Sequence, residues 1–180
     1  DDGAAERIRQ GDIYREIEYI ERAEWVDGEI VVSTIAFRRV IVLTQDCDLQ
    51  QDYTFRHAET NKGHDKYLLS VLVAPLHNVE DFYEGSHLRD LGRTMMVYKK
   101  QGSTANKNLK DNQVPRYHYM EFPDEIPIVS SVIDFKHYFS VPVEYLMKIK
   151  EEKFVCKVSE LYREDISHRF ASYLSRIGLP

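Results

Sequence analysis

Several side chains that can hold a phosphate or move a proton lie at the ends of two apolar segments. Arg38 and Arg39 stand at the start of the segment 38–44, and His77 follows the segment 70–76. An imidazole, with a reference pKa of ~6.5, exchanges protons near neutrality, and a guanidinium matches the geometry of a phosphate group. If the two segments are neighbouring strands, a guanidinium and an imidazole face one groove. That pair would supply a proton carrier and a phosphate-binding cation.

A cysteine between two carboxylates follows the first of these segments, in Gln45-Asp46-Cys47-Asp48. A thiolate there would be the nucleophile of a Cys/His-based hydrolase, with His77 as its base. The flanking carboxylates raise the pKa of a thiol, so this role needs His77 or an arginine to offset them. The structural alternative is that Asp46 or Asp48 caps a turn while Cys47 packs as a small hydrophobic residue.

A metal site around Cys47 is a further alternative, because several residues of suitable ligand type are close in the sequence. They are Asp46, Cys47, Asp48, His57, His64 and His77. No Cys-x2-Cys or His-x3-His spacing accompanies them, and a single sulfur is a poor basis for a structural zinc site. We therefore expect no metal and no other cofactor.

Charge is distributed unevenly along the chain, whose formal net charge is −6. Residues 1–29 have a net charge of −6, whereas residues 93–118 have a net charge of +5. An anion-binding surface in the basic segment would use Lys99, Lys100, Lys107, Lys110 and Arg116. Four rings lie close by in the sequence and would stack on unpaired bases: Tyr98, Tyr117, His118 and Tyr119. A solvated loop with ordinary aromatic packing explains the same residues without a nucleic acid.

Turn residues and hydrophobic periodicity predict strands in the first half of the chain. Asp27-Gly28 tolerates the positive φ of a tight turn, so we expect a hairpin with arms at 17–26 and 29–36. The apolar residues 39–44 predict a buried strand, after which a polar loop extends to about Lys66. A second buried strand is expected at 67–74, ended by Pro75.

The second half is expected to add strands and one helix. The expected strands are 94–99, 116–122, 128–135 and 138–143, and residues 79–91 are expected to hold no more than a helical turn. Ile166, Phe170, Leu174 and Ile177 form one apolar stripe, which predicts a C-terminal amphipathic helix over 160–178. Six to eight short strands with a terminal helix indicate a mainly β (α+β) fold, either a small barrel or a strongly bent sheet.

Length and composition are typical of one globular domain. The chain has 180 residues, of which 43% are hydrophobic. We expect one domain over 1–180, with a flexible lead-in at 1–11, a β-barrel region at 12–158 and the helix at 160–178. No apolar run approaches the ~18 residues of a membrane span, the first residues do not resemble a signal peptide, and two distant cysteines make no disulfide framework. We therefore expect a cytoplasmic protein without a membrane partner.

Three ordered pieces of the sequence resemble the MazF/PemK toxin superfamily: Gly11–Tyr14, Arg38–Asp46 and Ser70–Leu76. Members are small SH3-like barrels that act as metal-independent endoribonucleases and are usually dimers, so the resemblance implies that fold, that activity and a homodimer. It covers residues 11–78. The family's catalytic arginine, in an Arg-Pro pair, falls on Arg38, with Arg39 in place of the proline. The family's catalytic Thr or Ser falls on His77.

A second resemblance is to a group of uncharacterised bacterial proteins, and it implies no activity. These proteins combine a Gln/His-x-Cys-Asp-Leu strand end with a chain ending like Arg176–Pro180.

Two hypotheses of different kinds follow. In the first, the protein is an endoribonuclease acting on single-stranded RNA: Arg38 or Arg39 stabilises the phosphorane, His77 transfers protons, and Asp46 and residues 99–116 position the strand. In the second, it is a non-catalytic module on the same barrel that binds a partner protein or a nucleotide. The acidic net charge and the absent proline and threonine favour the second hypothesis, and the order of the three pieces favours the first. The hydrolase or metal site around Cys47 is third.

Overall fold

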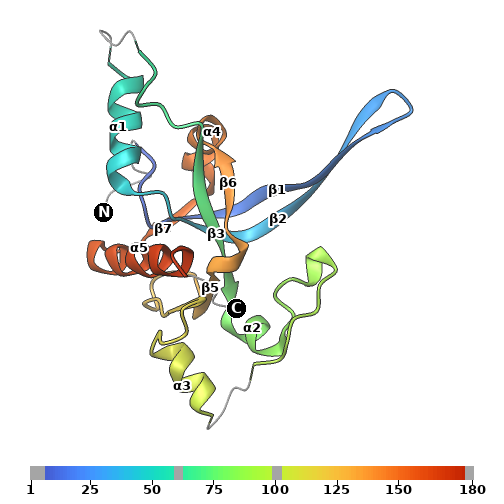
Figure 1. Ribbon diagram of the computed structural model, residues 1–180, viewed down its shortest axis with the longest axis vertical. Helices are drawn as coiled ribbons and strands as arrows, with labels where there is room; N and C mark the ends of the chain where they lie inside the picture. Colours follow the sequence, from blue (N-terminus) through green and yellow to red (C-terminus); the bar gives the residue numbers. More distant parts are fainter. Residues whose placement is uncertain (1–6, 59–62, 99–102, 177–180) are drawn as a thin grey trace.

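The computed structural model describes residues 7–58, 63–98 and 103–176, which form a mixed α+β fold around one antiparallel sheet (Figure 1). The sheet follows the order β4-β5-β3-β2-β1-β7, and β6 pairs with β3 beside that path. The seven strands are β1 (Asp12–Val26), β2 (Glu29–Val42), β3 (Ser70–Asn78), β4 (Tyr117–Met120), β5 (Ser131–Asp134), β6 (Phe139–Pro142) and β7 (Phe154–Lys157). The end strands β4 and β7 do not pair with each other, so the described strands form an open sheet and not a closed barrel.

Strand β3 is the centre of the sheet because it is paired along both edges. On one edge, Val73 is opposite Val42 of β2. On the other edge, β6 pairs with the first half of β3 and β5 with the second half. A short 3₁₀ helix, η2 (Phe135–His137), separates β5 from β6, so the two behave as one interrupted strand.

Pro75 does not end the second buried strand, contrary to the sequence prediction, because β3 continues to Asn78. Pairing with β6 stops at Val73, and pairing with β5 begins at Leu76. Pro75 is opposite Val40 of β2 on the other edge, but on this edge it occupies the interruption, where no strand needs its missing N–H.

The β1–β2 hairpin is confirmed and is longer than expected. Asp27 and Gly28 have φ values of 52° and 88°, the left-handed conformation that a two-residue primed turn requires. A bulge at Glu21 shifts the register between Ile20 and Arg22. The expected strand at 39–44 is the inner end of β2, and the outer part of the hairpin projects from the body as a two-stranded arm, residues 18–36 (Figure 1).

One face of this arm is apolar and uncovered. Cross-strand partners share a face, and the pairs Trp25–Ile30 and Ala23–Val32 place four apolar side chains together. Trp25 is 74% exposed and Ile30 is 64% exposed. An exposed apolar surface of this kind is typical of an interaction site.

The described residues contain five α-helices and a second 3₁₀ helix. They are α1 (Asp46–Arg56), α2 (Val79–Glu84), η1 (Arg89–Leu91), α3 (Thr104–Lys110), α4 (Val143–Lys153) and α5 (Glu160–Leu174). The C-terminal helix is confirmed as α5, which buries Ile166 and Phe170 against the sheet, whereas Leu174 is half exposed. Ile177 lies outside the described residues.

Several predicted elements are wrong. The polar loop expected after residue 45 begins as α1, whose first turn carries Asp46 and Asp48 beside the positive end of the helix dipole. The expected strand at 94–99 is not a strand over its described part, 94–98. Helix α4 and strand β7 were not expected, and residues 12–158 hold four α-helices beside the strands. Among the described residues, no helix has the length and hydrophobicity needed to cross a membrane.

Trp25 is the only tryptophan of the chain, so its fluorescence reports directly on the arm. We expect the emission maximum of the folded protein to match that of free N-acetyltryptophanamide, and acrylamide to quench it almost as efficiently, because the indole is largely hydrated. A blue-shifted, weakly quenched emission in dilute solution would contradict the exposed position of this residue.

Candidate functional site

Arg38, Arg39 and His77 line one pocket, which we call the His77 pocket. Its volume is about 170 Å³, and segment 86–91, with the side chains of His87 and Arg89, forms its opposite wall. The sequence predicted that the two apolar segments are neighbouring strands, and β2 and β3 are indeed paired.

The pocket exists because β2 and β3 separate. Their ladder ends at the pair Val40–Pro75, after which β2 continues into the arm and β3 continues toward β5 (Figure 1). Extending the register by two residues sets Arg38 opposite His77, so both side chains leave the sheet on the same face. Arg39 points the other way, and its guanidinium donates a hydrogen bond to the carbonyl of Pro127 at 2.9 Å.

His77 is a buried imidazole that is neutral at physiological pH. It is 7% exposed, and no described residue is a hydrogen-bond partner of its Nε2. Burial, with the neighbouring His87 adding to it, lowers the pKa of His77 to about 3. The two rings lie 4.8 Å apart between centroids, and burial also lowers the pKa of the more accessible His87. Both imidazoles are therefore neutral at physiological pH, and neither supplies an imidazolium.

Gly85 brings His87 over the sheet. It ends α2 in the left-handed conformation, with φ 71°, and its carbonyl accepts a hydrogen bond from the N–H of Met95. A Cβ on this glycine would lie 2.2 Å from the carbonyl oxygen of Met95. Only glycine fits this close approach of two backbone segments.

A buried ion cluster lies behind the histidines. The carboxylate of Asp134 is fully buried and accepts hydrogen bonds from Arg116 Nε at 2.8 Å and from the N–H of Lys136 at 3.0 Å. The Nδ1 atom of His137 is 2.9 Å from the same carboxylate. Burial alone would raise the pKa of Asp134, but Arg116 and His137 outweigh it and hold this pKa well below the ordinary value. Arg116, a predicted nucleic-acid contact, is thus engaged inside the protein.

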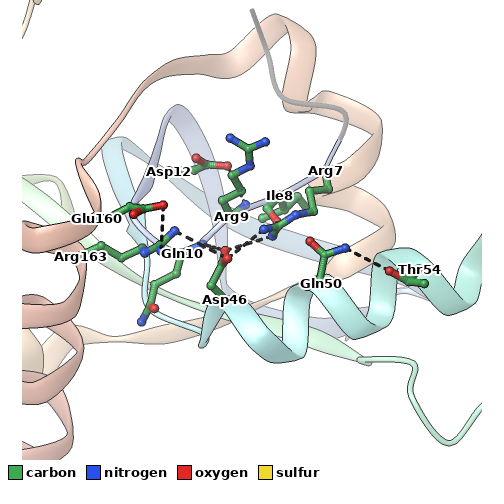
Figure 2. Close-up of polar contacts among 10 residues, drawn as sticks. All are labelled: Arg7, Ile8, Arg9, Gln10, Asp12, Asp46, Gln50, Thr54, Glu160 and Arg163. Carbon is green, nitrogen blue, oxygen red and sulfur yellow. Dashed lines mark hydrogen bonds and ion pairs between the residues drawn. The ribbon is translucent and has the colours of Figure 1, made fainter. Parts of the chain in front are cut away.

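Asp46 lies away from the His77 pocket and joins three parts of the chain (Figure 2). Its carboxylate pairs with Arg7 at 2.8 Å, accepts a hydrogen bond from the N–H of Gln10 and lies 3.6 Å from Arg163 of α5. Burial opposes ionisation, but the contacts with Arg7 prevail and lower the pKa of Asp46. These contacts give Asp46 a structural role, because they join the N-terminal segment to α1 and α5.

Cys47 is exposed in the first turn of α1 and does not border the His77 pocket. Its Sγ atom is 3.6 Å from Gln45 Oε1 and 3.8 Å from Asp48 Oδ1. The prediction that Cys47 packs as a small hydrophobic residue is wrong, and His77 is not placed to act as its base.

The basic segment contains a helix where the sequence predicted a loop. Lys107 and Lys110 lie on α3, and Lys110 Nζ is 5.7 Å from the centroid of the Tyr119 ring. Lys99 and Lys100 lie outside the described residues. Tyr98 and Tyr117 pack against Phe82, with ring centroids 5.3 Å and 4.9 Å away. Aromatic packing, the alternative interpretation of these rings, is therefore what the described residues show.

Two parts of the site were not predicted from the sequence. His87 is close to His77 only because Gly85 reverses the chain, and a glycine after an apolar helical turn was the one available signal. Asp134 and His137 come from an expected strand and a connection, where nothing marks them as polar core residues.

Comparison with known proteins gives no family for this chain. No family model matches it, and no curated protein matches it. Within residues 7–58, 63–98 and 103–176, no three His, Cys, Asp or Glu side chains are grouped so that they could hold a metal ion.

Replacing Gly85 tests whether the close approach positions His87. We expect Gly85→Ala to lower the free energy of unfolding by about 2 kcal/mol or more, because a left-handed φ and a backbone clash coincide. Gly92 is the matched control: it also has a positive φ, but a Cβ there meets nothing within 4 Å. Equal urea midpoints for Gly85→Ala and Gly92→Ala would contradict the packing of residues 85 and 95.

Asp134 makes stability depend on pH. Its pKa is lower in the folded chain than the ordinary value of 3.8, so its stabilisation is complete above that pH and is lost as the pH falls below it. We expect Asp134→Asn to cost about 3 kcal/mol at pH 7, because a buried ion pair loses one partner, and to reduce the acid sensitivity of unfolding. The exposed Asp124→Asn is the control. An unchanged slope of unfolding free energy against pH between 5 and 3 would contradict this role.

Proposed function

We propose that the protein is a metal-independent endoribonuclease that acts on single-stranded RNA at the His77 pocket. The observation that supports the proposal most directly is that Arg38 and His77 share one pocket, with Arg89 and a second imidazole beside them. These are the groups needed for attack of a 2′-hydroxyl on the adjacent phosphate.

The chemistry is a transesterification. The 2′-oxygen bonds to phosphorus while its proton passes to a neutral imidazole of the His77–His87 pair. The bond from phosphorus to O5′ then breaks, and O5′ takes up that proton, which leaves a 2′,3′-cyclic phosphate and a 5′-hydroxyl. Guanidinium groups of Arg38 and Arg89 balance the charge of the phosphorane. At about 170 Å³ the pocket fits a phosphate group better than a base, since ligand pockets usually exceed ~300 Å³.

The relationship to MazF/PemK-type SH3-like barrels belongs to this proposal. It is supported by the antiparallel β1–β2–β3 order, which covers the three sequence pieces that carry the resemblance. It implies that the open sheet is an expanded form of that barrel, with the segment from α4 to α5 added.

A non-catalytic protein-binding module is the second candidate, and the arm favours it. The face formed by Ala23, Trp25, Ile30 and Val32 is apolar and uncovered by any described residue, as expected of a surface that binds another protein. Asp81 and Asp90 also border the His77 pocket and weaken its attraction for phosphate.

Cleavage of a single-stranded RNA in EDTA tests the enzyme directly. We expect the purified protein to yield fragments with 2′,3′-cyclic phosphate ends, detected by mass spectrometry. Arg38→Ala and His87→Ala should each slow cleavage by about 100-fold, since each removes a group that acts in the transition state.

Arg22→Ala is the matched control, because Arg22 lies on the arm and pairs only with Glu24 in the described contacts. It should cleave at the wild-type rate. RNA that stays intact, or equal rates for Arg38→Ala and the wild type, would exclude the ribonuclease. Intact RNA together with a blue shift of Trp25 emission on adding a partner protein would support the binding module.

A further inference from the structure

A second and larger cavity lies between the two end strands of the sheet. Its volume is about 760 Å³, within the range of small-molecule sites. Residues of β4 form one wall, and residues of β7 and the start of α5 form the other, so the cavity fills the gap that keeps the sheet open. We call it the edge cavity.

The edge cavity and the His77 pocket are separate sites. His118 of β4 pairs with Ile133 of β5, which pairs with Leu76 of β3, so these three side chains lie on one face of the sheet. His77 is the next residue after Leu76 and therefore faces the opposite side.

The Nδ1 atom of His118 is a buried polar atom without a hydrogen-bond partner among the described residues. The side chain of His118 is 3% exposed and borders the edge cavity. Asp165 Oδ2 is 3.9 Å away, which is too far for a hydrogen bond. Burial, with Arg169 adding to it, lowers the pKa of His118 to about 4, so the imidazole is neutral at physiological pH. Burying a polar atom without a hydrogen-bond partner lowers the stability of the folded protein, and a bound ligand could supply that partner.

The other side chains around the edge cavity indicate which kind of ligand would fit it. The walls include the flat or apolar side chains Met120, Phe122, Pro123, Ile126, Val158 and Tyr162. Two lysines, Lys110 and Lys157, are balanced by Glu121 and Asp165. Glu121 also accepts a hydrogen bond from the Tyr119 hydroxyl at 2.7 Å. A site with balanced charge and aromatic walls suits an uncharged ring, not a phosphate.

We propose that the edge cavity binds an uncharged nucleobase, with its ring against Tyr162 and Phe122, and that a shift of the side chains covering His118 Nδ1 lets one polar ring atom hydrogen-bond to it. Either tautomer of a neutral imidazole serves, because nucleobases carry donors and acceptors side by side. The base belongs either to a free nucleoside or to an unpaired position of an RNA strand, and the site stands whether or not the His77 pocket cleaves RNA.

Isothermal titration calorimetry with adenosine, guanosine, cytidine and uridine, and in parallel with a six-nucleotide RNA, tests the site. We expect at least one nucleoside or the RNA to bind. His118→Phe should weaken that binding by about tenfold or more, because the hydrogen bond to the ring is lost. His118→Asn should recover part of it, since its amide can donate or accept near the position of Nδ1.

A loss of binding in His118→Phe can be distinguished from a loss of stability. Phenylalanine removes an unpartnered polar atom from a buried position, so His118→Phe should melt at or above the wild-type temperature while binding falls. The exposed His168 of α5 is the control, and His168→Phe should bind normally. Arg38→Ala should also bind normally, which separates this site from the proposed catalytic one.

Each outcome decides the proposal. Binding of nucleosides that depends on His118 supports a free ligand, and binding of the RNA alone with the same dependence supports a base of a strand. Absence of binding by all five compounds, or equal affinity for the wild type and His118→Phe, would overturn it.

Discussion

The last residue pair of the β2–β3 ladder, Val40–Pro75, determines where the His77 pocket and the projecting arm lie. Up to that pair the two strands are bonded in a conventional sheet, and their apolar side chains are fully buried. Beyond it, β2 leaves as a projecting arm and β3 turns its edges to new partners. The side chains at the separation, Arg38 and His77, gain a pocket there because no neighbouring strand fills the space between them.

The buried and partly buried polar groups of the fold are of two kinds: those paired with an oppositely charged side chain and those without such a partner. Asp46 and Asp134 are partnered by arginines and hold segments together: Asp46 joins the N-terminal segment to α1 and α5, and Asp134 joins β5 to the residues before β4. His77 and His118 are buried without equivalent partners, which keeps both imidazoles neutral. Carboxylates that a sequence motif suggests as catalytic can thus be structural, while the uncompensated imidazoles mark the places where a ligand would supply what is missing.

The sequence predicted those elements whose signal lies within a few neighbouring residues, and it missed those that depend on contacts between distant parts of the chain. The hairpin and the C-terminal helix were predictable because Asp27-Gly28 and the Ile166–Phe170 spacing act within a few residues. Helix α1 was not, because it buries only Leu49 and Asp52 and therefore shows no apolar periodicity. The shared pocket of Arg38 and His77 followed from two adjacent apolar segments, whereas the position of His87 depends on a glycine-mediated reversal that no spacing rule describes.

We propose that RNA is bound and cleaved where β2 and β3 separate. Nuclear magnetic resonance of the histidine rings and arginine side chains, during titration with a single-stranded oligonucleotide lacking 2′-hydroxyls, tests it most directly, because the strand can bind but cannot react. We expect the Arg38 and His87 signals to shift together as the strand is added. Shifts confined to other side chains, with those two signals unchanged at saturation, would contradict it.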